Sequence, residues 1–415
     1  MIAVGAIFKN EYPYITEWIA YYKLLGFNKF YIVDNISDDG SSELLTKLHE
    51  NGEITRIEYQ TIEGTKPQIH AYNLILDKAQ HECEYITFID ADEFLCFADS
   101  NQGIHDLIHF MNSKENIGGV ALSWCMFGSS HAILPGNGLI TERFDHRAEK
   151  SSNLNIYYKS FLKTNAIRRT KEGGIHHFPL NDGFKFVLTD GSEIKTTSGR
   201  SEYACWDICR LNHYVIKSNS EFYRKKMARG RPTGNNGDLN KYFFKNHDKN
   251  DVKDSFDSKI LSKLKYEKRI LDEKVGFQPS VTRHPPLYRR NDALKGRSHI
   301  DSITKKDSLL NIDGWCYYSG GDAVANICLI INKIEYIIPT TFIKKKRADV
   351  VSSGISDYEM CGFIATFDLS LIICATVQFL DIYAIDSSGD VIHDFNYENK
   401  ADILKELFTK IAINA

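Results

Sequence analysis

Two aspartates that directly follow an apolar run are the residues of this chain whose spacing best suits chemistry. Asp90 and Asp92 flank Ala91 at the end of the run Tyr85–Ile89, which is predicted to be a buried strand. If the chain stays extended there, alternate side chains point to one side and both carboxylates can face the same ion. Mg²⁺ and Mn²⁺ prefer such oxygen ligands and complete their coordination with substrate phosphates. The segment therefore predicts a Mn²⁺ or Mg²⁺ site that binds a nucleotide diphosphate. A helix cap or a solvated loop is the alternative.

Polar side chains also lie where other predicted strands end or where the third predicted helix begins. They are Lys9, Asn10, Glu11, Asp34, Asn35, Lys66 and Gln68. The loop from Asp34 to Gly40 carries short acceptors for a ribose or a uracil, although a turn followed by a helix cap would use the same residues. Lys66 and Gln68 stand where a lysine and the backbone donors of a helix start can approach a diphosphate, or where a helix start is merely solvated.

Aromatic and imidazole side chains form a third set of candidates. Trp124 opens the segment Trp124–His131, in which bulky apolar residues, a glycine, two serines and a histidine could form the floor of a sugar site. A tryptophan in a strand can equally be a core residue. His176, His177 and His213 could ligate a metal, although a lone histidine is more often a hydrogen-bonded structural residue. The metal interpretation of these histidines therefore depends on the acidic pair.

The elements that must position these residues alternate between strands and helices. Apolar runs predict strands at residues 1–8, 29–34, 54–59 and 85–89, and apolar residues at three- and four-residue spacing predict helices at 15–25, 41–48 and 68–80. This alternation predicts a mostly parallel, Rossmann-like α/β sheet. Because such sheets bind ligands at the carboxyl ends of their strands, the polar clusters that follow residues 8, 34 and 89 are expected along one edge.

The pattern changes in the later part of the chain. Further strands are predicted at residues 120–124, 157–163 and 211–216, followed by a basic helix at 220–229. Short β-type runs separated by Gly, Asp and Ser predict a small β-sandwich after residue 300, closed by a helix at about 401–411. The expected organisation is an α/β domain at residues 1–245, a charged connector at 246–300 and a β-rich accessory domain at 301–415.

Composition limits the class of partner and the compartment. A formal net charge of −3 and a pI of about 6.5 disfavour nucleic acid as a partner. The nine cysteines show no paired metal-ligand spacing, so they are expected to be reduced thiols. No apolar stretch reaches the roughly 18 residues needed to span a bilayer. We expect a cytoplasmic protein without a transmembrane segment, and peripheral association with the inner face of the membrane stays open.

Taken in order, the motifs carry a resemblance to a known family. They comprise residues 9–11, 17–18, 33–39, 68, 88–95, 124, 127–131, 176–177, 212–214, 217–218 and 221–222. This ordered set resembles the family 92-like, family 2-related glycosyltransferases over about residues 1–230. The resemblance implies a GT-A fold, a nucleotide-sugar donor with UDP as the expected nucleotide, and an inverting displacement assisted by Mn²⁺ or Mg²⁺. Because several known relatives transfer galactose, galactose is the favoured sugar.

The resemblance also assigns expected roles to individual residues. Asp90 and Asp92 look like the acidic metal motif, and His213 looks like the third metal ligand. The polar residues after the strands, together with Ala91 and Trp124, are the expected donor-binding residues. The acceptor is expected to be a glycan or a glycolipid, in surface polysaccharide or lipopolysaccharide synthesis.

An inverting transfer also needs a base that removes the proton of the acceptor. Four side chains are candidates for this role, although no clear motif selects among them: His131, Glu142, Asp145 and Asp207. His131 and Glu142 flank a loop that contains Pro135 and Gly136, so they rank slightly ahead of the other two.

Two other functions fit paired acids at the end of an α/β strand. A nucleotidyltransferase or sugar pyrophosphorylase is one, but its usual Gly-rich basic phosphate loop is missing, because residues 4–11 contain only Gly5 and Lys9 of that type. The other is a noncatalytic carbohydrate-binding protein. Release of UDP from a UDP-sugar would distinguish a transferase from both.

Overall fold

The computed structural model describes most of the chain. The described residues are 1–62, 65–113, 116–169, 174–227, 239, 241–278, 287–288, 297–317, 324–331, 335–356, 358–371, 380–387 and 389–395. They divide into two compact units, the first made of residues 1–130, 138–217 and 225–281, the second of 131–137, 218–224 and 282–415. The three-part division expected from the sequence stays a prediction. The expected helix at 401–411 lies outside the described residues.

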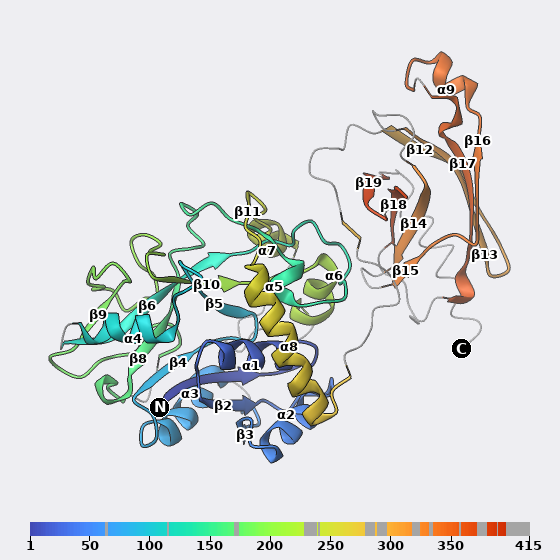
Figure 1. Ribbon diagram of the computed structural model, residues 1–415. Helices are drawn as coiled ribbons and strands as arrows, with labels where there is room; N and C mark the ends of the chain where they lie inside the picture. Colours follow the sequence, from blue (N-terminus) through green and yellow to red (C-terminus); the bar gives the residue numbers. More distant parts are fainter. Residues whose placement is uncertain are drawn as a thin grey trace. The chain divides into compact units, whose positions relative to one another are not determined.

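The first half of the main sheet forms from the predicted alternation. Its parallel strands are β1 (Ile2–Phe8), β2 (Lys29–Asp34), β3 (Thr55–Glu58) and β4 (Tyr85–Phe88), in the order β3-β2-β1-β4. The helices between them are α1 (Ile15–Leu24), α2 (Ser41–Glu50) and α3 (Pro67–Ala79) (Figure 1). Every residue of β1 is buried, as expected for a parallel strand covered on both faces. The ends of β2, β1 and β4 therefore lie side by side.

The second half of the sheet mixes directions. It contains β8 (Tyr158–Lys163), β6 (Ile117–Met126), β10 (Cys209–His213) and β5 (Glu93–Phe97), with β9 (Lys185–Val187) paired to β6. The strand β8 runs antiparallel between β4 and β6, while β5 runs antiparallel to β10 at the edge of the sheet. Consecutive strands β4 and β5 are thus not neighbours. The short turn between them reaches from the middle of the sheet towards β10.

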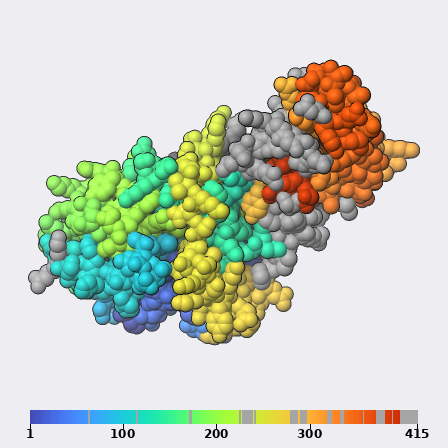
Figure 2. All heavy atoms as spheres, turned by 45° about the horizontal axis from the view of Figure 1, so that its top comes forward, coloured from blue at the N-terminus to red at the C-terminus, as the bar shows by residue number. Residues whose placement is uncertain are grey.

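The remaining elements of the first unit are short, apart from one helix. They are α4 (Ile104–Asn112), α5 (Ile140–Arg143), β7 (His146–Arg147), α7 (Lys241–His247), β11 (Val252–Lys253) and α8 (Ser258–Val275). Asp257 caps α8 by accepting the N–H groups of Lys259 and Ile260, and Gly276 ends it at a positive φ of 62°. The helix α8 packs on α1 and lies at the surface of the unit (Figures 1 and 2).

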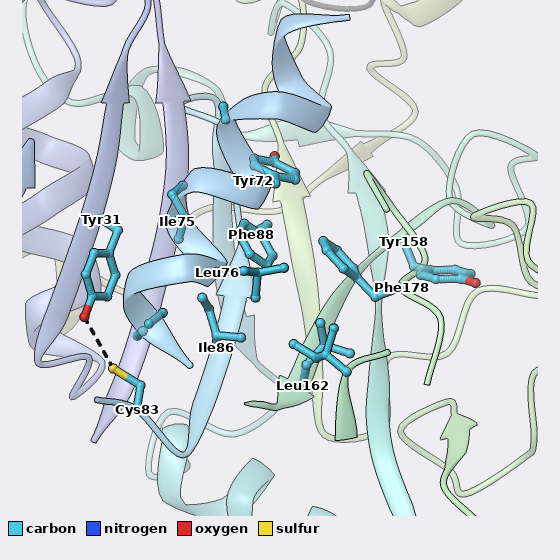
Figure 3. Packing of buried hydrophobic residues seen from close by; sticks show 14 of the residues in the cluster. Tyr31, Tyr72, Ile75, Leu76, Cys83, Ile86, Phe88, Tyr158, Leu162 and Phe178 are labelled. Atoms are coloured by element: carbon cyan, nitrogen blue, oxygen red, sulfur yellow. Dashed lines mark hydrogen bonds between the residues drawn. The ribbon is translucent and has the colours of Figure 1, made fainter. Parts of the chain in front are cut away.

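An aromatic cluster holds α3 and a later loop against β4. The ring of Tyr72, on α3, lies 4.4 Å from the ring of Phe88, and Phe88 stacks on Phe178 at 4.9 Å (Figure 3). Phe88 is the last residue of β4, so this packing fixes the strand end from which Asp90 follows. Phe178 likewise anchors the loop that carries His176 and His177.

The second unit contains two antiparallel sheets. One consists of β12 (Arg297–Lys306), β13 (Leu309–Tyr317), β17 (Gly362–Asp368) and β16 (Thr341–Lys345), the other of β15 (Glu335–Ile337), β14 (Asn326–Ile331), β18 (Leu380–Ile385) and β19 (Val391–Asp394). Buried residues of both sheets, such as Ile312, Leu329, Phe363 and Ile382, form one core. The unit also contains the short helices α6 (Asn219–Glu221) and α9 (Ala348–Ser352) and two 3-10 turns, Glu359–Cys361 and Leu369–Leu371. A π-helical turn follows α6 up to Met227, and its last three residues belong to the first unit. The predicted fold class, a mostly parallel α/β sheet with a β-rich region after it, is confirmed.

Two smaller expectations concern membranes and thiols. Within the described part of the chain, no helix is both long enough and apolar enough to cross a membrane. The eight cysteines of that part are free thiols, and seven of them are buried.

Candidate functional site

The acidic segment forms a turn instead of continuing as an extended strand. The last link of the parallel ladder is the N–H of Ile89, which donates to Gly5 O at 3.0 Å. The N–H of Glu93 then donates to Asp90 O at 3.0 Å, and the Asp90 N–H donates to Glu93 Oε2 at 2.8 Å. The two aspartates therefore do not alternate along an extended chain. Their carboxylates have different partners.

Asp90 is held by polar groups from α3 and β8. Its Oδ1 accepts hydrogen bonds from Gln68 Nε2 at 3.0 Å and from the Tyr72 hydroxyl at 3.2 Å, and its Oδ2 lies 3.0 Å from Lys159 Nζ. The Lys159 side chain has no exposed surface. Burial alone would raise the pKa of Asp90, but Lys159 outweighs it and holds that pKa below its usual value. Burial would lower the pKa of Lys159, which Asp90 and Glu93 instead hold well above its usual value.

Glu93 is wholly buried beside the same lysine. Its Oε2 lies 3.7 Å from Lys159 Nζ, and its Oε1 lies 4.0 Å from His213 Nδ1. Burial, together with the charge of Asp90, raises the pKa of Glu93 to about 8. Oε1 of Glu93 and Nδ1 of His213 are both buried without a hydrogen-bond partner among the described residues. Glu93 thus faces the protein interior and is uncharged over much of the neutral range.

Asp92 lies on the other side of the turn, next to β10. Its Oδ1 is 3.5 Å from His213 Nε2 and its Oδ2 is 2.9 Å from Lys226 Nζ. The backbone brings them together, because Glu93 pairs with His213 in the β5–β10 ladder and the Tyr214 N–H donates to Asp92 O at 2.8 Å. Burial would raise the pKa of Asp92, but Lys226 and His213 hold it well below its usual value. Burial lowers the pKa of His213 despite Asp92.

An aromatic wall adjoins this pair. The ring of Trp124 lies 4.3 Å from that of His213, 5.5 Å from His176 and 5.2 Å from Tyr157, on which it stacks. Arg200 lies over the other ring of that stack, 4.4 Å from the centroid of Tyr157. Burial and the charge of Lys159 lower the pKa of His176 to about 4, so this imidazole is neutral. Trp124 is therefore brought to the metal candidates, as a sugar-contacting residue would need to be.

The residues fit a divalent ion in part. Asp92 Oδ1 and His213 Nε2 are nearly buried and 3.5 Å apart, a separation that suits two ligands of one ion. Asp90 is different, because its Oδ1 accepts two hydrogen bonds from α3 and its Oδ2 is paired with the wholly buried Lys159. Within the described part, one cluster brings three His, Cys, Asp or Glu side chains close enough to share an ion, with ligand atoms within 4.8 Å of one another. It comprises Asp190, Cys205 and Asp207, and not Asp92 and His213. An ion held by Asp92 and His213 would thus need substrate oxygens or water as its further ligands.

The loops after β1 and β2 meet at the same edge, as predicted. The Asn10 N–H donates to Ser37 Oγ at 3.0 Å, and the Asp38 N–H donates back to Asn10 Oδ1 at 3.0 Å. The Glu11 N–H donates to Ser41 Oγ at 2.9 Å. Lys9 at this edge is half-buried, Lys66 at the start of α3 is exposed, and Ala91 in the turn is buried.

Asp34 and Asn35 have internal partners. The Asp34 carboxylate is fully buried, accepts Nε and Nη2 of Arg56 at 3.0 and 2.5 Å, and accepts the Ser42 hydroxyl at 3.0 Å. Asn35 Oδ1 accepts the Thr61 hydroxyl at 2.7 Å. Asp34 thus lies at the expected edge, where it positions the Arg56 side chain.

The four candidate bases are not brought together. Glu142 Oε1 pairs with Lys265 Nζ at 2.6 Å, and Asp145 Oδ1 lies 2.8 Å from His146 Nδ1. Asp207 belongs to the group with Asp190 and Cys205, in which the two aspartates are exposed and the cysteine is buried. His131 belongs to the second unit and has a positive φ of 62°.

Sequence reasoning missed two lysines and a tyrosine of this site. Lys159 left a weak signal, since it lies within the predicted strand 157–163, and a lysine in a buried strand needs a counter-charge. Lys226 and Tyr72 left no such signal. Lys226 lies in the predicted basic helix at 220–229, and Tyr72 fits the apolar face of a helix.

Comparisons with known proteins bear on the first part of the chain. Residues 3–195 match the model of glycosyltransferase family 92. The resemblance expected from the motifs is confirmed over that segment, which contains Asp90, Asp92 and Lys159 but ends before His213. A family 92 protein of Oryza sativa subsp. japonica is 29% identical over 188 residues, which cover 45% of this chain and 31% of the rice protein. One of Arabidopsis thaliana is 25% identical over 222 residues, covering 51% of this chain and 37% of that protein.

The chain therefore spans about a third of the length of these family 92 relatives. Among solved structures, S. aureus TarS 1-349 is 15% identical, with a TM-score of 0.30, over 54% of this chain and 62% of that one. The same TarS segment is also known in complex with UDP-GlcNAc, with 16% identity and a TM-score of 0.29 over 49% of this chain and 60% of that one.

Proposed function

We propose that this protein is a metal-dependent inverting glycosyltransferase that moves a sugar, with galactose favoured, from a UDP-sugar to a glycan or glycolipid acceptor. The observation that carries the proposal is the pair Asp92 and His213, whose Oδ1 and Nε2 atoms lie 3.5 Å apart. Asp92 follows β4 inside the family 92 match, and His213 ends β10 beyond it. A carboxylate and a neutral imidazole of this kind suit Mn²⁺ or Mg²⁺ bound together with a diphosphate. Synthesis of a surface polysaccharide or a lipopolysaccharide at the cytoplasmic face of the membrane is the setting we favour.

Asp90 and Asp92 have different proposed roles. A bound ion would stabilise the negative charge that gathers on the departing diphosphate. Asp92 and His213 would hold the ion, while Asp90, fixed by Gln68, Tyr72 and Lys159, keeps the turn in the shape that presents Asp92. Trp124, in contact with the His213 ring, provides an apolar face on which a sugar ring can rest.

Removal of the acceptor proton needs a group poised near neutral pH. Among the four candidates, Asp145 has an imidazole partner, since its Oδ1 lies 2.8 Å from His146 Nδ1. The backbone connects this pair to the site, because the Gly128 N–H donates to His146 O and the preceding Phe127 N–H donates to His213 O, each at 3.0 Å. A carboxylate that orients an imidazole is a common arrangement for a general base. We therefore rank His146, positioned by Asp145, first for this role.

A panel of UDP-sugars incubated with the full chain and Mn²⁺ tests the proposal. Release of UDP that requires the metal and is fastest with UDP-galactose is the expected result. Nucleotide-dependent pyrophosphate exchange would instead indicate a nucleotidyltransferase. Neither reaction, with sugar binding retained, would indicate a carbohydrate-binding protein.

A further inference from the structure

Each of the two aspartates has its own lysine, and the two lysines differ in how firmly they are held. Lys159 has no exposed surface and lies between Asp90 and Glu93, at 3.0 and 3.7 Å. Lys226 reaches Asp92 from outside the sheet, at 2.9 Å, and its side chain is 18% exposed. It stands on the π-helical turn Phe222–Met227, and π-helical turns are frequent at functional sites. Lys159 is thus a fixed part of the core, whereas Lys226 can turn away into water.

The position of Lys226 conflicts with a bound ion. A divalent ion on Asp92 Oδ1 and His213 Nε2 would sit roughly 2.1 Å from each ligand atom. The Lys226 ammonium, 2.9 Å from the other oxygen of the same carboxylate, would then face two further positive charges at close range in a nearly buried site. Each acid already has one counter-charge, so an added ion would leave the site with an unbalanced positive charge.

We propose that Lys226 and the divalent ion compete for Asp92, so that the ion binds only when the Lys226 side chain leaves the carboxylate. This inference rests on the proposed function, because it concerns the same metal site. Lys226 keeps the Asp92 charge balanced while no ion is bound. The apparent affinity for the ion is therefore lower than Asp92 and His213 alone would give. It equals their intrinsic affinity multiplied by the fraction of molecules in which Lys226 has moved away.

The test measures binding of Mn²⁺ alone to the full chain, by calorimetry and by electron paramagnetic resonance of the free ion. Lys226→Met should bind Mn²⁺ about ten-fold more tightly than the wild type, since the competitor is gone. Lys226→Arg keeps the charge and should stay within about two-fold of the wild type. Asp92→Asn should abolish binding both in the wild-type background and together with Lys226→Met. A thermal melt of each variant would verify folding.

Lys217→Met is the matched control for loss of one positive charge. The Lys217 ammonium also contributes to the field at Asp92, but it lies 4.7 Å above the Tyr14 ring. This variant should change the affinity for Mn²⁺ by less than about three-fold. Equal affinity in Lys226→Met and the wild type, with binding lost in Asp92→Asn, would overturn the competition while leaving the metal site intact. Absence of Mn²⁺ binding in every variant would overturn the metal site as well.

Discussion

Lys159 Nζ lies 3.0 Å from Oδ2 of Asp90, and the lysine side chain has no exposed surface. Replacing Lys159 removes the nearest cation from Asp90, whose side chain is 33% exposed and can be partly solvated, so the cost is on the order of 2 kcal/mol, less than for a fully buried pair. Lys159→Met should therefore lower the free energy of unfolding by about that amount, measured by urea denaturation at pH 7. Lys163→Met, on the same strand but partly exposed, should cost less than about 1 kcal/mol. Equal losses in the two variants would contradict the stabilising role of the pair.

Asp90 and Asp92 should respond differently to the same substitution. Asp90→Asn leaves the buried Lys159 without its nearest counter-charge, so the free energy of unfolding should fall by about 2–3 kcal/mol. Asp92→Asn removes the charge opposite Lys226, whose side chain is partly exposed and can be solvated, so stability should fall by less than in Asp90→Asn while metal-stimulated transfer is lost. Denaturation and assays of UDP release with and without EDTA measure the two effects. Full activity in Asp92→Asn would remove the central claim about the metal.

Glu93 should make stability fall as pH rises through the neutral range. Its pKa of about 8 in the folded protein exceeds the usual value of 4.5, so the folded chain holds this proton more tightly than the unfolded chain. The contribution is full below about pH 4.5 and is lost as pH rises to about 8. Glu93→Gln removes this dependence and should gain on the order of 2 kcal/mol over the wild type between pH 5 and pH 8.

Chemical denaturation at pH 5, 6.5 and 8 would follow that gain. Glu84→Gln, whose side chain is 79% exposed, is the control and should track the wild type. A constant difference between Glu93→Gln and the wild type over this range would show that Glu93 is ionised throughout.

Asp34 should affect the nucleotide through Arg56. The Asp34 carboxylate is fully buried and accepts both Nε and Nη2 of Arg56 at the edge where the donor is proposed to bind. Asp34→Ala should weaken UDP binding by about ten-fold in calorimetry and leave the chain folded. Glu58→Ala, which removes an exposed partner 3.1 Å from the same guanidinium, should leave UDP affinity within about two-fold. Unchanged affinity in Asp34→Ala would place the nucleotide elsewhere.

His146 and Asp145 should act together in removing the acceptor proton. His146→Gln should lower kcat by about 100-fold or more if the imidazole removes the acceptor proton. Asp145→Asn keeps the hydrogen bond to Nδ1 but removes the charge that stabilises an imidazole gaining a proton, so kcat should fall by about ten-fold while KM stays within about two-fold. An unchanged kcat in Asp145→Asn would remove Asp145 from this role.

The sequence alone determined the alternation of strands and helices and the place of the acids after β4. Both follow from local patterns, since apolar periodicity selects the element and polar residues begin where a strand ends. The same patterns led to Gln68, Trp124 and His213 as candidates, and the structure brings each of them to Asp90 or Asp92 or to one another.

Only the tertiary structure decided what the two carboxylates face. The strand β8 inserts antiparallel between β4 and β6, which brings Lys159 to Asp90 over a separation of 69 residues, and the β5–β10 register brings His213 to Asp92. Pairings between distant segments are selected by the packing of the whole sheet, because several partner strands could satisfy the backbone hydrogen bonds of one strand equally well. The turn at Asp90–Glu93 has the same origin. Its chain must leave the middle of the sheet to reach β10, so it cannot stay extended, and the two acids separate to different lysines.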